Sequence, residues 1–543
     1  IPFFTNIHIF KADPIVIEKL KEQNKLLKND KLNHSYPHSW RSKAPLIYRA
    51  TPQWFISMEK NSLRNKAIKA IGDTSFYPEK GKDRLLSMIE DRPDWCVSRQ
   101  RVWGVPLPIF INKKTKEPLR DKKVIERIAE IYEKEGSDCW FTDDAKKFLG
   151  DKYNPEEFEK LQDIVEVWFD SGSTHSFVLE KRKDLKWPAD MYLEGSDQHR
   201  GWFHSSLLES CGTRGRAPFN SILSHGFVVD GKGLKMSKST GNVTSPEDIL
   251  KNYGADILRA WVASSDYAED LRIDKTILSQ HAESYRKIRN TFRFILGNIN
   301  DRFEPKSLKS IEIQKFNELE QYIFHKLFVL DRSVKENLKN YNFHKLYREL
   351  LNFCSLDLSS FYFDIRKDVL YCDNLNSKKR KECVIVLNVI LECLLKWFAP
   401  IFVFTTDEIY SLLSNDEKSI HEHLFPSIPQ EWENNILDEK WKELFKIKQE
   451  ANIAIEEKRS NKVIGSSLEA ELKITTGSKN FDLLEGLDLA EYFITSKAEK
   501  NKSENQDDLK IEVKKTKGTK CPRCWKILDA ECTRCTQAIK DSN

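Results

Sequence analysis

Hydrophobic and polar positions divide the chain into stretches of different period. Between about residues 60 and 265, short apolar runs alternate with amphipathic segments, an order typical of a parallel α/β sheet. The expected strands are "WCVS", "VWF", "MYLEG" and "SILSHGFVV", beginning at residues 95, 167, 191 and 221. A charged insertion at 112–161 interrupts them. From about 270 to 425, apolar positions recur with the helical period, which predicts an all-helical region.

The two ends of the chain are more mixed. The first 60 residues contain a predicted helix, "DPIVIEKLKEQNKLL", and then a proline-containing extended connector. Residues 426–515 are rich in lysine and include a strand-like "LEAELKITT", while "SKAEKNKSENQDD" is expected to be a charged linker. The predicted division is therefore 1–60, 61–265, 266–425, 426–515 and 516–543.

A polar loop, "GLKMSKSTGN" (233–242), lies between the last predicted strand and a well-marked helix start. Ser245 is expected to cap that helix, with Pro246 as its first residue. Lys235 and Lys238 are compact charges on flexible stems, and such side chains suit charge that develops on phosphate oxygens. The alternative interpretation is an ordinary solvated basic loop.

Composition narrows the class of protein. Of the 543 residues, 40% are apolar and 31% are charged, which indicates a globular chain, and the net charge of +5 allows a nucleic-acid partner without demanding one. The longest apolar stretch, 383–404, contains Glu392, Lys396 and Pro400. It therefore predicts a buried helix, and no membrane association is expected.

Cysteines give the clearest chemical signal near the C-terminus. The four residues Cys521, Cys524, Cys532 and Cys535 follow the pattern C-x2-C-x7-C-x2-C, which can close four thiolates on one Zn²⁺. Disulfides are the alternative. Eleven cysteines without an export signal favour a reducing cytoplasm, where disulfides are rare. The other seven cysteines are expected to be core or incidental residues.

Several longer motifs carry a resemblance to a known family. The segment "KMSKS", Lys235 to Ser239, is similar to the second signature of class I aminoacyl-tRNA synthetases. The isoleucyl-tRNA synthetase family, in its bacterial form, is resembled by further segments: "YLEGSDQHRGWFHSSLL", "DWCVSRQRVWGVPLPIF", "VWFDSGSTHS", "NYGADILRAWVASSDY", "SYRKIRNTFRFILGN" and the terminal "CPRCW". The likeness runs over nearly the whole chain.

This resemblance implies a fold and a reaction. The fold would be the second half of a Rossmann-like parallel sheet, followed by a helical anticodon-binding bundle, a small α+β junction and a zinc knuckle. Isoleucine and ATP, with Mg²⁺, would give isoleucyl-adenylate and pyrophosphate, and the isoleucyl group would then pass to tRNA(Ile). A monomer is expected. The resemblance assigns Lys238 to the ATP phosphates, with Lys235 assisting.

The same resemblance places an adenylate site at the end of the "MYLEG" strand. Glu194 would contact the aminoacyl-adenylate, through either the amino-acid ammonium or the ribose hydroxyls. Gly195 would allow close backbone approach, and Asp197 and Gln198 would line the pocket. His225 is a candidate nucleotide contact. Taken alone, the segment is also compatible with a tight turn and a salt bridge.

Two further groups of residues are expected at the ligands. Trp168 and Ser171 are candidates for the wall of the amino-acid pocket. Arg286, Arg289 and Arg293 stand at helical spacings and form a basic stripe that suits tRNA phosphates, with a solvated face as the alternative. Trp525 suits either contact with tRNA or packing of the zinc knuckle.

One family motif is missing from the sequence. The first signature, H-x-G-H, does not occur. The chain begins "IPFFTNIHIF", without methionine, so we expect a fragment that cannot form adenylate alone. The first 60 residues resemble the tail of an insertion that edits mischarged valine. The alternatives are a valyl- or leucyl-specific relative, a non-catalytic tRNA-binding paralogue, and a zinc-ribbon factor.

Overall fold

The computed structural model describes residues 4–39, 42–237, 240–299, 308–414, 417–506 and 508–540. Two compact units are present: residues 1–56 with 94–166, and residues 57–93 with 167–543. Each unit is described by itself. The predicted helix near the N-terminus is confirmed as α1, Ala12–Glu22.

The first unit is built from short antiparallel pairs and a small helical cluster. Its strands are β1 (Phe55–Ile56), β3 (Trp95–Cys96), β4 (Ser98–Arg99), β5 (Phe110–Asn112), β6 (Phe158–Lys160) and β7 (Ile164–Val165). They pair as β1 with β3, β4 with β7 and β5 with β6. Helix α5 (Cys139–Thr142) carries the buried Trp140, which packs in one apolar cluster with residues of α4 (Lys122–Glu135) and α6 (Ala145–Leu149). The expected strand "WCVS" therefore pairs antiparallel in this unit.

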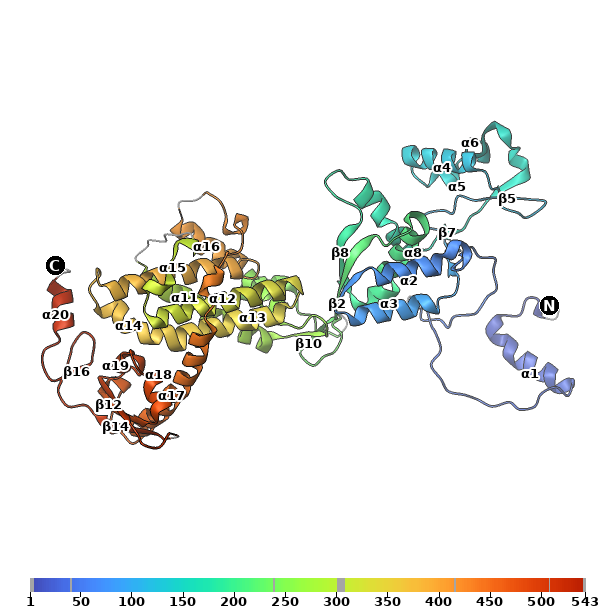
Figure 1. The fold of residues 1–543 in the computed structure, drawn as a ribbon. Coiled ribbons are helices and arrows are strands. Elements are labelled where there is room, and N and C mark those ends of the chain that lie inside the picture. Colours follow the sequence, from blue (N-terminus) through green and yellow to red (C-terminus); the bar gives the residue numbers. More distant parts are fainter. Residues whose placement is uncertain are drawn as a thin grey trace. The chain divides into compact units, whose positions relative to one another are not determined.

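A three-stranded parallel sheet lies in the second unit, in the order β2–β9–β8. Its strands are β2 (Ser75–Tyr77), β8 (Ala189–Gly195) and β9 (Phe219–His225). Helices α2 (Leu63–Gly72), α3 (Lys80–Glu90) and α8 (Trp202–Arg214) pack beside it (Figure 1). The "MYLEG" strand and the "SILSHGFVV" strand are confirmed, but the latter breaks at Gly226, and β10 (Val228–Asp230) pairs with β11 (Leu271–Ile273).

The expected strand "VWF" is wrong, because residues Val167–Gly172 form helix α7. This short apolar run packs against α8, and its tryptophan lies close to the backbone of Gly201. A three-residue apolar run fits a strand or a helix equally well, so its long-range packing decides its conformation.

Helices dominate the following region, as the period predicts (Figure 1). They are α9 (Pro246–Tyr253), α10 (Ala255–Ser264), α11 (Lys275–Asn298), α12 (Glu318–Lys339), α13 (Phe343–Asn352), a π-helical segment (Phe353–Tyr362), α14 (Phe363–Cys372), α15 (Lys378–Phe398), α16 (Val403–Leu413) and α17 (Asn435–Ser460). The apolar stretch at 383–404 is buried in this bundle. Within the described ranges, no helix has the length and apolar character needed to cross a bilayer.

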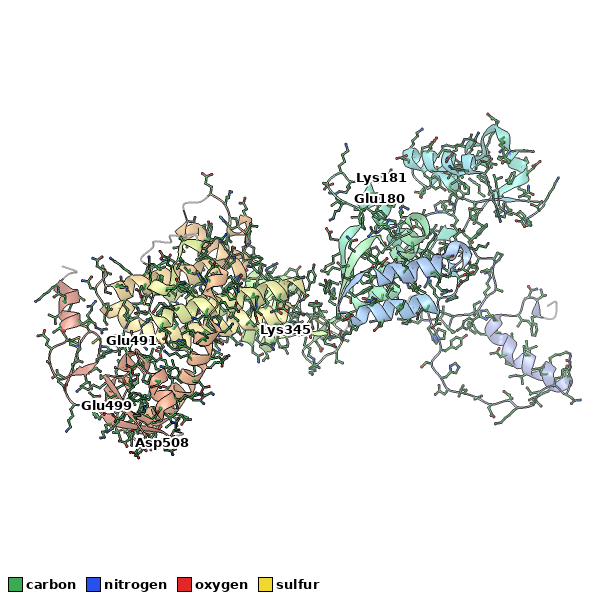
Figure 2. All side chains as sticks on the ribbon, in the orientation of Figure 1. Glu180, Lys181, Lys345, Glu491, Glu499 and Asp508 are labelled. Carbon is green, nitrogen blue, oxygen red and sulfur yellow. The ribbon has the colours of Figure 1, made fainter. Side chains whose placement is uncertain are left out.

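A small mixed sheet, in the order β13–β12–β14, follows the bundle. Its strands are β12 (Ala470–Thr476), β13 (Lys497–Lys502) and β14 (Leu509–Lys515), and the helices α18 (Ser478–Leu483) and α19 (Leu489–Tyr492) connect the first two. The segment expected to be a linker therefore contains a strand, which carries Glu499 (Figure 2). Leu472 and Ile474 of the adjacent central strand β12 are fully buried.

The outer face of this sheet alternates in charge. Glu471 stands opposite Lys497 on one side and Lys514 on the other. One pair further along, Lys473 stands between Glu499 and Glu512, two carboxylates on opposite strands. Opposite charges directly across strands stabilise a sheet, so a segment that looks like a charged linker can pair as a strand.

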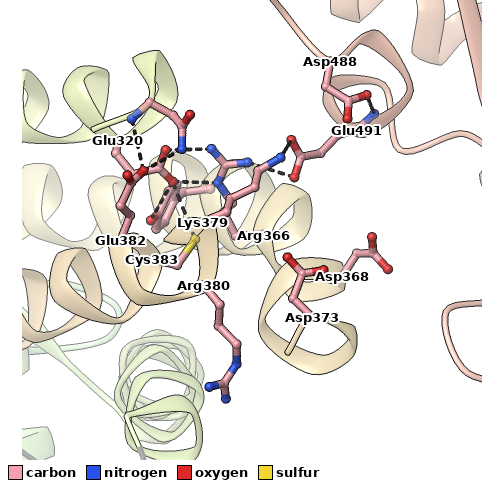
Figure 3. Close-up of polar contacts among 12 residues, drawn as sticks. Glu320, Arg366, Asp368, Asp373, Lys379, Arg380, Glu382, Cys383, Asp488 and Glu491 are labelled. Carbon is pink, nitrogen blue, oxygen red and sulfur yellow. Dashed lines mark hydrogen bonds and ion pairs between the residues drawn. The ribbon is translucent and has the colours of Figure 1, made fainter. Parts of the chain in front are cut away.

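A buried ion-pair network joins the sheet region to the bundle (Figure 3). The Arg366 guanidinium of α14 donates to both carboxylate oxygens of Glu320, at 2.6 and 2.7 Å. Its other side pairs with Glu491 of α19 at 2.9 Å, and Glu491 also pairs with Lys379 at 2.5 Å. Because Glu320 and Arg366 are almost fully buried, the network fixes α19 against the bundle.

Candidate functional site

The candidate adenylate residues lie at the carboxyl ends of β8 and β9. The strand register pairs Glu194 with Ser224 and Gly195 with His225. A Cβ at Gly195 would stand 2.6 Å from Asp197 Oδ1 and 3.8 Å from the His225 ring. The carboxyl edge is where ligands bind to open parallel sheets, so four of the sequence-predicted residues are brought together there.

Glu194 and Asp197 are exposed at this edge, whereas His225 is half-buried. The Glu194 carboxylate accepts a long hydrogen bond from the Gly195 amide at 3.4 Å. The His225 ring nitrogen Nδ1 lies 2.7 Å from the Gly226 carbonyl, so its other nitrogen is directed elsewhere. Two acidic groups and an imidazole can thus receive an ammonium, hydroxyls or a nucleotide base.

Gln198 has a role that its sequence pattern does not reveal. Its Oε1 accepts the backbone amide of Trp202 at 2.9 Å, at the start of α8. Its Nε2 donates to Asp197 at 3.1 Å. The glutamine therefore satisfies one of the unpaired amides at the helix start and orients Asp197.

Helix α7 brings Trp168 and Ser171 to the start of α8. The Trp168 ring would lie 2.8 Å from a Cβ at Gly201, so only glycine allows this approach. The Ser171 carbonyl accepts the Trp202 indole at 3.0 Å, and the Trp202 ring stacks on Tyr192 at 4.1 Å. The half-exposed face of Trp168 is thereby held in a fixed position beside the sheet end.

A buried carboxyl lies behind α7. Burial, and then the neighbouring charge of Asp170, raise the pKa of Glu209 to about 9. A side chain at Gly172 would overlap Glu209 Oε1, which has no hydrogen-bond partner within the described part of the chain. Sequence reasoning missed this group, since one glutamate within an apolar helix gives no signal of its contacts.

At Gly226, between the end of β9 and the lysine loop, the backbone closely approaches residues 267–269. The Gly226 amide donates to the Tyr267 carbonyl at 2.9 Å. A Cβ at this position would stand 2.3 Å from the Glu269 carbonyl oxygen, which is backbone and cannot turn aside. The chain therefore passes from β9 to β10 under a fixed backbone segment.

The lysine loop is braced by two side chains that sequence reasoning missed. Asp230 accepts the Leu234 amide at 2.8 Å, and the Asn242 amide group donates to Asp230 at 2.9 Å and to the Lys235 carbonyl at 3.2 Å. Asn242 Oδ1 accepts the Ser237 amide at 2.9 Å and the Thr240 hydroxyl at 2.6 Å. The Asn242 amide, followed by backbone amides, holds the pKa of Asp230 below its ordinary value.

Lys235 is exposed on this loop, and its backbone forms a bridge with Val229. Lys238, the residue assigned to ATP phosphates, lies outside the described residues, as does Ser239. Met236 packs against a small apolar cluster that includes Ile249 and Trp261. The predicted cap is confirmed: Ser245 Oγ accepts the Asp248 amide at 3.2 Å, with Pro246 first in α9.

The arginine stripe lies on α11. Arg286, Arg289 and Arg293 are all exposed. Arg286 pairs with Glu283, and Arg289 donates to the Tyr285 hydroxyl at 3.2 Å. The described contacts leave the guanidinium faces accessible to solvent.

The four cysteines of the C-terminal pattern converge. The sulfur atoms of Cys521, Cys524, Cys532 and Cys535 all lie within 4.8 Å of one another. The Cys524 and Cys532 sulfurs are 3.9 Å apart, close to the separation of about 3.8 Å in a tetrahedron with 2.3 Å metal–sulfur bonds. The strands β15 (Thr519–Lys520) and β16 (Ile527–Leu528) and helix α20 (Thr533–Lys540) position them.

The thiol chemistry suits a metal. Burial alone would raise the pKa of Cys521, but the backbone amides of Cys524 and Arg523 donate to its sulfur and bring the pKa down to about 7. Burial raises the pKa of Cys524 and Cys535, so a cation would be needed to hold all four sulfurs as thiolates. A thiolate stabilised by backbone amides is the form that binds Zn²⁺. This four-cysteine group could therefore hold one metal ion.

Comparison with known proteins identifies the family. Residues 15–274 match the family described as tRNA synthetases class I (I, L, M and V). Residues 320–474 match the anticodon-binding domain of tRNA ligase. The chain is 65% identical over 534 residues to isoleucine–tRNA ligase of Pelagibacter ubique, covering 98% of the chain and 59% of that protein. It is 44% identical over 548 residues to the Zymomonas mobilis enzyme of that name, covering 97% of the chain and 58% of the relative.

The fold has a matching solved structure. Methionyl-tRNA synthetase of Mycobacterium tuberculosis, in complex with methionyl-adenylate, aligns with a TM-score of 0.51 at 15% identity, over 72% of this chain and 69% of that one. The chain spans somewhat more than half the length of the curated relatives it matches. It belongs to the class I aminoacyl-tRNA synthetases, in the group where its curated relatives are isoleucine–tRNA ligases.

Proposed function

We propose that the chain supplies the pyrophosphate-releasing and tRNA-binding parts of an isoleucine–tRNA ligase. One observation carries this proposal: Glu194 and His225 end adjacent parallel strands, and the chain runs from His225 through Gly226 towards the loop that bears Lys235. The names of the relatives support the same activity. Editing of mischarged valine is proposed for the whole enzyme.

In the first step, a carboxylate oxygen of isoleucine attacks the α-phosphorus of ATP, and pyrophosphate leaves. Lys235 and Lys238 would stabilise the negative charge that develops on the leaving phosphates. Glu194 would hold either the amino-acid ammonium or the ribose hydroxyls, and His225 would contact the nucleotide. Mg²⁺ would accompany ATP. Most of the rate acceleration then comes from positioning and charge stabilisation.

The amino-acid side chain would lie against Trp168. The Gly201 backbone and the Ser171–Trp202 hydrogen bond hold this ring in place. Gly195 would admit the adenylate close to the strand, while Asp197, oriented by Gln198, lines the edge. Because one methylene is worth only about 1–3 kcal/mol, rigidity of this wall matters for discrimination among aliphatic amino acids.

In the second step, the isoleucyl group passes to the terminal adenosine of tRNA(Ile). We assign phosphate contacts on the tRNA to Arg286, Arg289 and Arg293. Trp525 would add an aromatic contact, since the residue is 60% exposed and its φ of 63° is unusual for a tryptophan. Zn²⁺, held by the four cysteines, would join the two cysteine turns and stabilise the fold of the C-terminal knuckle.

The activity is tested with a protein of the relatives' full length that contains this chain. We expect isoleucine-dependent ATP–pyrophosphate exchange, reduced about 10²–10³-fold by Lys238→Ala. Valine, leucine and methionine serve as competing substrates. A preference for valine or leucine would replace the substrate assignment, and tRNA binding without any exchange would identify a non-catalytic paralogue.

The arginine stripe has its own test. Each of Arg286→Ala and Arg293→Ala should weaken tRNA(Ile) binding and reduce the slope of log affinity against log salt by about 0.7–0.9. Lys446→Ala is the matched control, because Lys446 is an exposed cation that pairs with Glu443 on α17. Unchanged salt dependence in the arginine variants would show that the three arginines form a solvated helix face and do not contact tRNA.

A further inference from the structure

Both cysteine turns carry an arginine at the same place. The sequences are Cys-Pro-Arg-Cys, with Arg523, and Cys-Thr-Arg-Cys, with Arg534. Each arginine directly precedes the second cysteine of its turn. Both guanidinium groups extend from their turns to the same target, the C-terminal end of α14 in the helical bundle.

Arg534 makes the stronger of the two contacts. Its guanidinium donates to the two oxygens of Asp368 at 2.7 and 2.9 Å, and to Asp373 at 3.3 Å. Figure 3 shows these two carboxylates side by side at the end of α14. The carboxylates are 21% and 13% exposed, so solvent screens the contacts only partly. Lys526, two residues after Cys524, adds a longer pair to Asp368 at 3.7 Å.

Arg523 binds the helix end itself. Its guanidinium donates to the carbonyls of Tyr371 and Cys372, both at 3.1 Å. The last carbonyls of a helix lack partners within it, and the helix dipole favours a cation there. The Cys372 thiol, which is buried with the four cysteines, lies 3.9 Å from the Arg523 carbonyl. Helix α14 thus contacts the cysteine cluster from the side of the bundle.

We propose that the end of α14 is an outer support of the metal centre. Through Asp368 and the helix-end carbonyls, it holds the two arginines and therefore both cysteine turns in the chelating arrangement. Metal retention and docking of the knuckle onto the bundle then form one linked equilibrium, in which each strengthens the other. This inference rests on the proposed Zn²⁺ site.

The test compares two aspartates of α14. Asp368→Asn removes the charge that Arg534 binds, whereas Asp364→Asn, the control, removes a carboxylate that pairs with Lys367 on the same helix. Protein loaded with Zn²⁺ is mixed with excess of a chromophoric chelator, and the release of metal is followed. Partners of metal-binding side chains typically change affinity 10–100-fold, so we expect release from Asp368→Asn to accelerate by that order and release from the control to be unchanged.

The reciprocal effect is read by hydrogen exchange. Removal of Zn²⁺ from the wild type should raise exchange at residues 368–373, and it should raise it less in Asp368→Asn, where the link is already weakened. Should Asp368→Asn fail to fold, Arg534→Lys keeps the charge but loses the two-pronged contact, and the same acceleration is expected.

The outcomes separate the two proposals. A wild-type protein without stoichiometric Zn²⁺ overturns the metal site and this inference together. If the wild type binds stoichiometric Zn²⁺ but the folded variant releases it at the wild-type rate, the inference is wrong and the metal site is retained. The same conclusion holds if hydrogen exchange at 368–373 does not change when the metal is removed.

Discussion

At the scale of single residues, Asn242 organises the lysine loop. Its side-chain amide joins Asp230, Lys235, Ser237 and Thr240 by four hydrogen bonds. Asn242→Asp keeps the shape but places a second carboxylate beside Asp230. We expect the proposed ATP–pyrophosphate exchange to fall about 10²-fold, because small displacements of a catalytic group have effects of that size. Unchanged exchange would show that the brace is dispensable.

Glu209 gives a prediction about pH. Because burial raises its pKa to about 9, above that of an exposed carboxyl, folding favours the protonated form. Its contribution to stability is complete at acid pH and is lost as the pH rises towards about 9. The melting temperature of the wild type should therefore fall between pH 5 and pH 8 by more than that of Glu209→Gln.

Glu180 provides a control of opposite sign (Figure 2). The hydrogen bond from Arg214 lowers the pKa of Glu180, so its contribution is present above the ordinary carboxyl pKa and is lost in acid. Glu180→Gln should lower the melting temperature at pH 8, and this loss should shrink as the pH falls below the ordinary carboxyl pKa and through the lowered pKa of the folded state. Parallel pH profiles of wild type and Glu209→Gln would contradict a buried, protonated Glu209.

At the scale of elements, the charged face of the small sheet determines its strand pairing. Lys473→Glu would place three carboxylates in one row, with Glu499 and Glu512 on either side. Like charges directly opposite are destabilising, and we expect the melting temperature of this region to fall by roughly 2–4 °C. Adding Glu499→Lys should restore part of the loss. A double variant no better than the single one would show that the row does not act by charge.

The sequence predicts elements well where a local signal is strong. The apolar runs at β8 and β9 and the Ser245–Pro246 cap need no distant partner to be recognised. Helix α7 and strand β13 were missed because α7 depends on Gly201 and β13 on Lys473 and Glu471, which lie far away in the sequence. Motifs single out Glu194, which lies at the end of β8, and the four cysteines, whose sulfurs converge. They do not reveal that Gln198 accepts the Trp202 amide or that Asp368 binds Arg534.

At the scale of the whole molecule, one buried arginine connects the bundle with the C-terminal sheet region. Arg366→Met would leave Glu320 and Glu491 without their common partner, so we expect a loss of about 3–5 kcal/mol of unfolding free energy. Glu491→Gln should cost less, because the Arg366–Glu320 pair remains. Denaturant unfolding measures both variants. Equal losses would mean that the contact to α19, and not the buried charge, dominates.

The close backbone approach at Gly226 has a consequence for natural variation. Because Gly226 has no Cβ, its backbone can lie against Glu269 while its carbonyl contacts the His225 ring and the chain continues into the lysine loop. Sequence drift can alter loop length or charge on either side, yet any side chain at this point would redirect the path that follows. Among functioning descendants of this gene, position 226 should therefore stay glycine while its surroundings change.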